Sequence, residues 1–174
     1  MTDVVTTREI AAWWPVPGAA SHKYTRGVVG IDAGSRQYPG AALLAIAGAL
    51  GAGPGMVRYL GSAPRDLVVG RFPSAVLADG QVQAVVVGSG WGALDDAAAR
   101  FREALERRVS LVIYADALRQ LPTDLPAETL LTPHAGELAR LLRVERGEIE
   151  ADPVAAAVLA AGRFGATVLL KGAI

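Results

Sequence analysis

Short apolar runs that end in glycine-rich or polar turns recur along this chain, and most of them are followed by a segment with helical periodicity. Runs in which apolar residues do not alternate with polar ones are typical of strands buried on both faces. Strands that alternate with helices form a parallel sheet through right-handed crossovers. We therefore predict an α/β fold with a mostly parallel sheet. The predicted strands are residues 27–32, 56–60, 84–88, 111–115, 130–131 and 167–170.

Capping residues and the placement of proline and glycine indicate helices between these strands. The segment 61–83 is ambiguous, because its pattern fits a helix at 63–72 and a short edge strand at 74–78. The segment 93–108 has the most regular apolar stripe, formed by Leu94, Ala97, Ala98, Phe101 and Leu105. In the last helix the apolar side consists of Val154, Ala157, Val158 and Ala161. The predicted helices are 6–14, 41–50, 93–108 and 153–164, and a further helix begins at 133.

The length of 174 residues suffices for one domain, and no linker divides the chain. We predict a single domain over 1–174, in which 1–20 form a lead-in helix and a connector. Hydrophobic residues make up 52% of the chain and aromatic residues 6%, a balance typical of parallel sheets and their covering helices. The formal net charge of zero removes the electrostatic basis for binding nucleic acid or an anionic membrane.

Residue counts exclude several chemistries. The absence of cysteine excludes disulfides, thiolate metal sites and cysteine nucleophiles, and with two histidines a multi-histidine zinc site is not expected. The start of the chain lacks the basic and apolar regions of a signal peptide. The most apolar stretch, 40–53, is shorter than the roughly 20 residues that span a membrane. We therefore expect a cytoplasmic protein.

The turns that follow the predicted strands would all lie at one edge of a parallel sheet. Ligands of open α/β sheets bind at this carboxyl edge, so a composite binding site is plausible there. The turns are 32–40, 88–92, 115–117, 132–136 and 171–172.

The segment 130–142 shows this arrangement most clearly. Thr132 is the predicted N-cap and Pro133 the first helical residue, which places His134 in the first turn of a helix. Backbone N–H groups and the helix dipole favour an anion at such a position. The alternative is that the segment starts a helix and His134 is an ordinary surface residue; the local pattern favours neither.

The other turns each allow two interpretations. The glycines of 88–92 let a ligand approach the backbone, or they make a tight turn. Asp116 could orient a hydroxyl or hold magnesium through water, but a cap of the following turn is favoured. Lys171 could bind a phosphate or be a solvated charge, and Trp91 could stack on a base, although packing is commoner.

As an ordered set, these segments resemble the ADP/ATP-dependent NAD(P)H-hydrate dehydratases of the ribokinase-like superfamily. The resemblance runs from about Ser21 to the last residue. It implies a ribokinase-like, three-layer α/β fold with helices on both faces of the sheet. The residues that carry it are His22, Lys23, Arg26 and Gly27, then 33–35, 38–42, 51–53, 88–92, 115–118, 132–137 and 170–173.

The resemblance also implies an activity and a site. Members of this family use ADP or ATP, with Mg²⁺, to dehydrate hydrated NADH or NADPH through phosphorylation and phosphate elimination. By motif, Ala41, Gly90 and His134 would contact the hydrated dinucleotide. The nucleotide would be bound by Lys171, Gly172 and Ala173. Relatives assemble as homo-oligomers, so a homo-oligomer is expected, without nucleic-acid or membrane partners.

Departures from the family pattern bear on activity. Tyr24, Ser89, Trp91 and Tyr114 replace the usual residues at tolerant positions. The family's Gly-Ser-Gly-Asp motif, with the expected catalytic aspartate, would lie beyond Ile174. We therefore expect the amino-terminal part of a dehydratase domain, incomplete at its carboxyl terminus and with little turnover alone. It should also expose an apolar strand edge at 167–170.

Two other functions are kept open. A different ribokinase-like enzyme would phosphorylate a small molecule such as a vitamin precursor. A non-catalytic module would hold a nucleotide or a partner through the same turns, without releasing phosphate.

Overall fold

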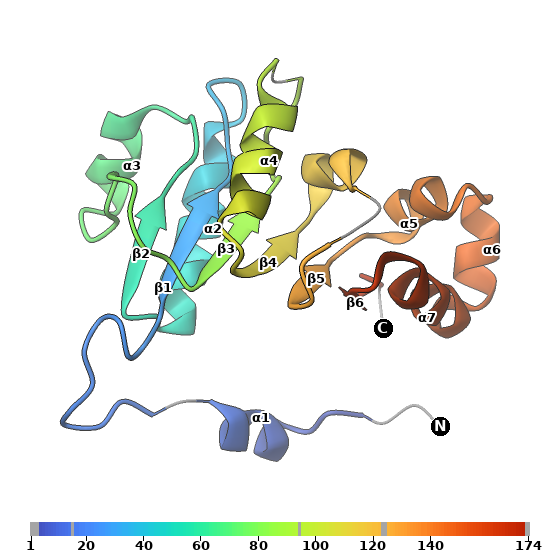
Figure 1. Cartoon of the computed structure of the whole chain (residues 1–174), viewed down its shortest axis with the longest axis horizontal. Helices are drawn as coiled ribbons and strands as arrows, with labels where there is room; N and C mark the ends of the chain where they lie inside the picture. Colours follow the sequence, from blue (N-terminus) through green and yellow to red (C-terminus); the bar gives the residue numbers. More distant parts are fainter. Residues whose placement is uncertain (1–3, 15, 94, 123–124, 173–174) are drawn as a thin grey trace.

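The computed structural model describes residues 4–14, 16–93, 95–122 and 125–172. Within these ranges, six strands form one sheet in the order β2-β1-β3-β4-β5-β6 (Figure 1). Ile31 pairs with Tyr59 on one side and with Val86 on the other. Each neighbouring pair is parallel, which confirms the predicted parallel sheet. The strands are β1 (Val28–Asp32), β2 (Met56–Tyr59), β3 (Ala84–Val87), β4 (Ser110–Ile113), β5 (Thr129–Leu131) and β6 (Thr167–Val168).

Helices cover both faces of this sheet. On one face, α2 and α3 bury Ile46 and Val68 in a cluster with Ile31. On the other face, α4 and the 3-10 helix η1 form a second cluster, in which Phe101 packs with Val85. A third cluster joins α5, α6 and α7, whereas α1 buries none of its residues and lies away from the sheet (Figure 1). The helices are α1 (Thr7–Trp13), α2 (Pro39–Ala52), α3 (Arg65–Arg71), α4 (Ala97–Glu106), η1 (Ala115–Gln120), α5 (Ala135–Leu142), α6 (Arg146–Ala151) and α7 (Pro153–Phe164).

Two predictions for the middle of the chain were wrong in detail. Instead of an edge strand at 74–78, the structure has an isolated bridge between Arg58 and Val76. The helix predicted at 93–108 begins four residues later, at Ala97. Its predicted stripe changes accordingly, because Ala98 is exposed and Ala104 is buried instead. Leu94 lies outside the described residues.

The carboxyl-terminal helices also differ from the predicted pattern. On α7 the large residues Val154 and Val158 are 52% and 68% exposed, while Ala156 and Ala160 are buried. The helix packs through its small residues because α5 and α6 approach it closely on that side. The helix α6 was not predicted. The last strand ends at Val168, and Leu169 is half-exposed, as expected for an apolar edge.

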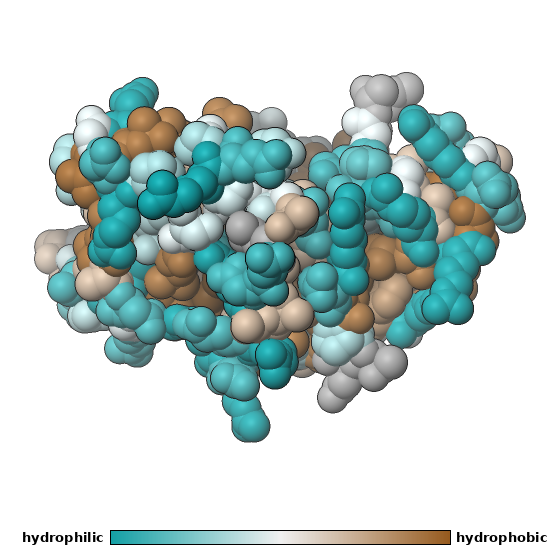
Figure 2. Space-filling view, turned by 90° about the horizontal axis from the view of Figure 1, so that it is seen from above, coloured by the Kyte–Doolittle hydropathy of each residue, from teal (hydrophilic) through white to brown (hydrophobic). Residues whose placement is uncertain are grey.

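No helix in the described part of the chain is long and apolar enough to cross a membrane. The face shown in Figure 2 is largely hydrophilic, with hydrophobic patches between polar side chains toward its two ends. The patch at the right of Figure 2 lies on the side of the molecule that holds α5 to α7 in Figure 1.

Candidate functional site

The order of strands changes direction next to β1, because the chain passes from β1 to β2 on one side and then to β3 on the other. Such a switch point opens a crevice between the two loops that leave the sheet there. The Gly34 N–H donates a hydrogen bond of 2.6 Å to the carbonyl oxygen of Ser89. This bond joins the loop after β1 to the glycine loop after β3.

Ala41 and Gly90, both predicted to contact substrate, lie against each other at this crevice. Gly90 has a positive φ of 65°, and a Cβ at this position would overlap the Cβ of Ala41. Only glycine therefore allows the loop to approach the first turn of α2 so closely. The two residues line a cavity of about 740 Å³ together with Tyr38, Ser89 and Tyr114.

Two carboxylates hold the glycine loop. The indole N–H of Trp91 donates to the carbonyl oxygen and to Oδ1 of Asp32, both at 3.1 Å, and the Trp91 side chain is buried. On the other side, Asp116 Oδ2 accepts the N–H of Gly92 at 2.8 Å. Trp91 is thus a packing residue, not a stacking platform. Asp116 fixes the loop, which differs from the cap that we predicted.

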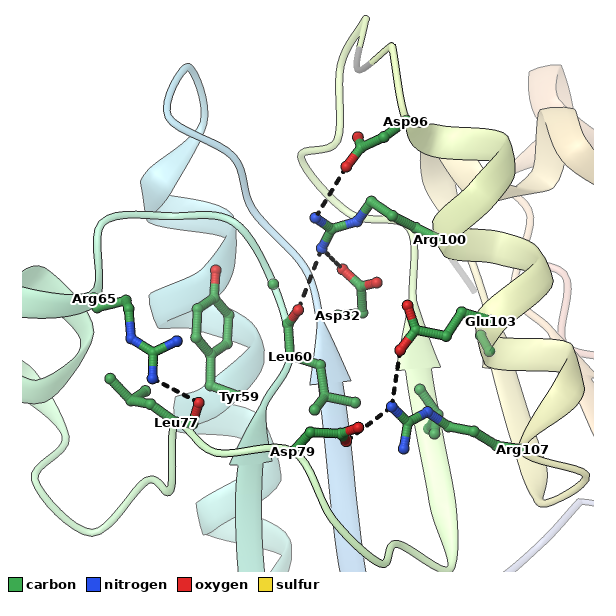
Figure 3. A pocket seen from close by; sticks show the side chains of 13 residues that line it. Asp32, Tyr59, Leu60, Arg65, Leu77, Asp79, Asp96, Arg100, Glu103 and Arg107 are labelled. Atoms are coloured by element: carbon green, nitrogen blue, oxygen red, sulfur yellow. Dashed lines mark hydrogen bonds and ion pairs between the residues drawn. The ribbon is translucent and has the colours of Figure 1, made fainter.

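Asp32 lies at the end of β1 and forms an ion pair with Arg100 of α4 (Figure 3). Burial raises the pKa of the Asp32 carboxyl, while hydrogen bonds and charge from Arg100, together with the Trp91 indole, act to lower it. The Arg100 guanidinium also lies over the Trp91 ring, 5.7 Å from its centroid. The three side chains therefore connect the glycine loop, β1 and α4.

The cavity beside this ion pair has a volume of about 360 Å³ and is lined mainly by charged side chains (Figure 3). Arg107 pairs with Asp79 at 2.8 Å and with Glu103 at 3.1 Å, and Arg65 donates to the Leu77 carbonyl at 2.7 Å. The ion pair between Arg107 and Asp79 connects α4 to the segment that precedes β3. This cavity was not foreseen from the sequence.

The start of α5 differs from the prediction, because its N-cap is His134 and not Thr132. Thr132 still donates its N–H to Ile113, and the Pro133 carbonyl accepts the N–H of Lys171, so sheet pairing continues through both residues. The helix can begin only after this pairing ends. His134 Nδ1 accepts the Glu137 N–H at 3.2 Å, and Glu137 Oε2 accepts the His134 N–H at 2.8 Å, which forms a capping box.

Lys171 follows β6 and forms a parallel bridge with His134. Its Nζ lies 3.7 Å from Glu137 Oε2. Gly172 follows Lys171 and lines the same cavity. Ala173 lies outside the described residues. A cavity of about 960 Å³ is lined by His134, Lys171 and Gly172, with walls from α6 and α7 that include Ile149 and Val158.

The structure thus divides the predicted site residues between two cavities on the same edge of the sheet. Ala41 and Gly90 line the cavity over β1 and β3, and His134 and Lys171 line the cavity over β5 and β6. β4 lies between the two in the sheet, and neighbouring strands are about 4.8 Å apart. Both groups therefore fall within reach of a long ligand that lies across the strand ends.

Comparison with known proteins identifies the family. Residues 29–174 match the family model of the NAD(P)H-hydrate dehydratases. The chain belongs to this family. Among curated relatives, the bifunctional NAD(P)H-hydrate repair enzyme of Mycobacterium tuberculosis is 44% identical over 98% of this chain, which spans 38% of that protein. An ADP-dependent (S)-NAD(P)H-hydrate dehydratase of Xanthomonas campestris is 33% identical, and the alignment covers 91% of this chain and 63% of that protein.

Solved structures place this NAD(P)H-hydrate dehydratase family member in the ribokinase-like fold. The Bacillus subtilis ADP/ATP-dependent NAD(P)H-hydrate dehydratase, co-crystallized with ATP and Mg²⁺, superposes with a TM-score of 0.84 at 27% identity, covering 96% of this chain and 65% of that one. A ribokinase-like superfamily protein of Enterococcus faecalis has a TM-score of 0.80 at 21% identity, covering 90% of this chain and 61% of that one. The chain therefore spans about two thirds of these structures or less.

The sequence analysis of this family member did not single out Glu137, whose carboxylate lies near both His134 and Lys171. Its signal was present, since a glutamate three residues after an N-cap is the mark of a capping box. With Thr132 as the predicted cap, the position three residues later is Ala135 and no capping box is predicted. Among the described residues, no group of three or more His, Asp or Glu side chains could hold a metal ion.

Proposed function

We propose that the chain carries the ligand-binding part of an ADP/ATP-dependent NAD(P)H-hydrate dehydratase, a lyase that repairs hydrated NADH and NADPH. In this reaction the terminal phosphoryl group of the nucleotide passes to the hydroxyl of the hydrated ring. Loss of that phosphate and of a ring proton then restores the nicotinamide double bond. The family match over 29–174 supports this assignment.

The observation that carries the proposal is the pairing of Lys171 with His134 on adjacent strand ends. A lysine ammonium is a compact point charge suited to phosphate. In the proposed arrangement, Lys171 and Gly172 receive the nucleotide, with Ala173 next in the chain. His134 contacts the hydrated dinucleotide, whose other part extends toward Ala41 and Gly90.

We propose that Mg²⁺ binds together with the nucleotide. Mg²⁺ is usually held by substrate phosphates and one or two carboxylates, and seldom by a cage made of protein groups alone. The nucleotide phosphates would then supply most of the ligands of the ion. A homo-oligomer is part of the same proposal, and sedimentation equilibrium would measure the mass of the assembly.

Calorimetry with the 174-residue chain tests this assignment. We expect binding of ADP or ATP with Mg²⁺, and tighter binding of hydrated NADH than of NADH itself. Replacing Lys171 with Met should weaken nucleotide binding by about 10–100-fold, because a charged hydrogen bond contributes roughly 1.5–3 kcal/mol. The matched control is Lys23→Met, which removes an exposed lysine of the connector.

Different results would point to the other functions. Phosphorylation of a vitamin precursor, without selective binding of hydrated NADH, would indicate a small-molecule kinase. Nucleotide binding without any affinity for the hydrated dinucleotide would favour a non-catalytic module. If neither nucleotide binds, the proposal is wrong.

A further inference from the structure

Glu137 contacts both His134 and Lys171, the two residues that the proposed function assigns to different ligands. Its Oε1 lies 3.5 Å from His134 Nε2, and its Oε2 lies 3.7 Å from Lys171 Nζ. The Glu137 side chain is 12% exposed, whereas those of His134 and Lys171 are 54% and 44% exposed. A well-packed carboxylate thus lies between two partly exposed side chains.

The hydrogen bonds at the helix start orient the imidazole of His134. Its Nδ1 accepts the N–H of Glu137 and so carries no proton itself. In the neutral ring the proton is then on Nε2, the atom that faces Glu137 Oε1. The charge on Glu137 therefore influences how firmly the ring is held.

The contact between Lys171 and Glu137 is weak enough to be exchanged. The lysine is partly exposed and 3.7 Å from the carboxylate, and ion pairs of this kind contribute little to stability. A phosphate group with two negative charges attracts the ammonium more strongly than one carboxylate does. When the ammonium moves to a phosphate, the Glu137 carboxylate is left to interact with His134 alone.

We propose that Glu137 is a positioning residue that couples the two ligands, because a phosphate bound at Lys171 releases the Glu137 carboxylate to orient His134 for the second ligand. The inference rests on the proposed function, which places a nucleotide at Lys171 and hydrated NADH at His134. It adds the route by which one ligand affects the affinity for the other. By linkage, the effect must be equal in both directions.

The variant Glu137→Gln tests this coupling. Glutamine keeps one oxygen for the His134 N–H but removes the charge that Lys171 and His134 share. The matched control is Glu148→Gln, since Glu148 has the same place in the capping box of α6, where Oε1 accepts the Glu145 N–H at 2.9 Å. We measure the dissociation constant of ADP–Mg²⁺ with and without saturating hydrated NADH.

In the wild-type chain and in Glu148→Gln, hydrated NADH should tighten ADP binding at least about fivefold, the lower end of the usual range of coupling between sites. In Glu137→Gln this ratio should fall to about one. If Glu137 had a purely structural role, its replacement would weaken the binding of each ligand separately. The ratio of the two ADP dissociation constants would then stay unchanged. If both ligands bind and the ratio in Glu137→Gln equals that of the wild type, the coupling does not exist, although the proposed function stands. If the wild-type chain binds no ADP, both proposals are wrong.

Nitrogen NMR of the imidazole rings gives a second readout. The chain has two histidines, so His22→Gln assigns the signals of His134. Addition of ADP should shift the His134 Nε2 signal in the wild type and not in Glu137→Gln. In Lys171→Met without ligand, the same signal should already be displaced in the direction that ADP produces, because the carboxylate is released. An unshifted signal in Lys171→Met would contradict the proposal even if Glu137→Gln failed to fold.

Discussion

The indole N–H of Trp91 donates to Asp32, so that the glycine loop after β3 is anchored to the end of β1. Both side chains are buried, and Arg100 pairs with the same carboxylate. The loop that carries Gly90 is therefore fixed from the interior of the protein.

Replacing Trp91 with Phe should destabilise the fold by about 1–3 kcal/mol, because the buried Asp32 oxygen loses its indole donor. Urea unfolding measures this change. The matched control is Trp13→Phe on α1, where the side chain is 69% exposed and the expected change is within about 0.5 kcal/mol. Equal effects of the two substitutions would show that the bond to Asp32 is unimportant.

The buried carboxyl of Asp32 should leave a signature in the pH dependence of stability. Burial raises its pKa in the folded protein above the ordinary value of 3.8, so the folded state binds this proton more tightly than the unfolded state. Between the two pKa values, the folded state holds more protons and stability falls as pH rises. Relative to Asp32→Asn, the wild-type free energy of unfolding should therefore decrease as pH increases from 3.8 upward. A difference that increases with pH would contradict this assignment.

Replacing Gly90 with Ala should destabilise the fold by about 1–3 kcal/mol, since the new methyl group overlaps Ala41 and φ is positive. The affinity for hydrated NADH should fall as the loop moves away from α2. The control is Gly48→Ala on α2, where nothing lies within 4 Å of the added methyl group. Alanine in a helix interior should stabilise there by about 0.5–1 kcal/mol. Unfolding and calorimetry of both variants provide the comparison, and a neutral Gly90→Ala would show that the close approach is not required.

Removing the Asp116 carboxylate should loosen the glycine loop from its other side. Asp116→Ala loses the bond to the Gly92 N–H, which we expect to weaken binding of hydrated NADH about fivefold, corresponding to about 1 kcal/mol. Asp116→Asn keeps an acceptor oxygen and should bind nearly as well as the wild type. If Asn is as damaging as Ala, the negative charge of Asp116 matters more than its hydrogen bond.

Much of the fold follows from local patterns. Continuous apolar runs such as 84–88 can be stable only as strands covered on both sides, and the helices between them require a parallel sheet. The gathering of Ala41, Gly90, His134 and Lys171 at one edge follows from the same geometry. That these residues bind ligands stays a prediction.

The details that decide the site depend on contacts between distant segments. Pro133 pairs with Lys171, 38 positions further along the chain, and this pairing delays the start of α5 and makes His134 its cap. On α7, Ala156 and Ala160 are buried instead of the valines that the pattern predicted, because the neighbouring helices require small residues at the contact.

The sequence alone thus determined the parallel α/β architecture and the edge at which the motifs meet, because hydrophobic periodicity and helix signals act over a few residues. The tertiary structure decided which side chains face each other there. The buried Asp32–Arg100 pair and the carboxylate of Glu137 between His134 and Lys171 arise from strand register and helix packing. No local pattern contains that information, since each contact joins elements whose relative placement is set by the whole sheet.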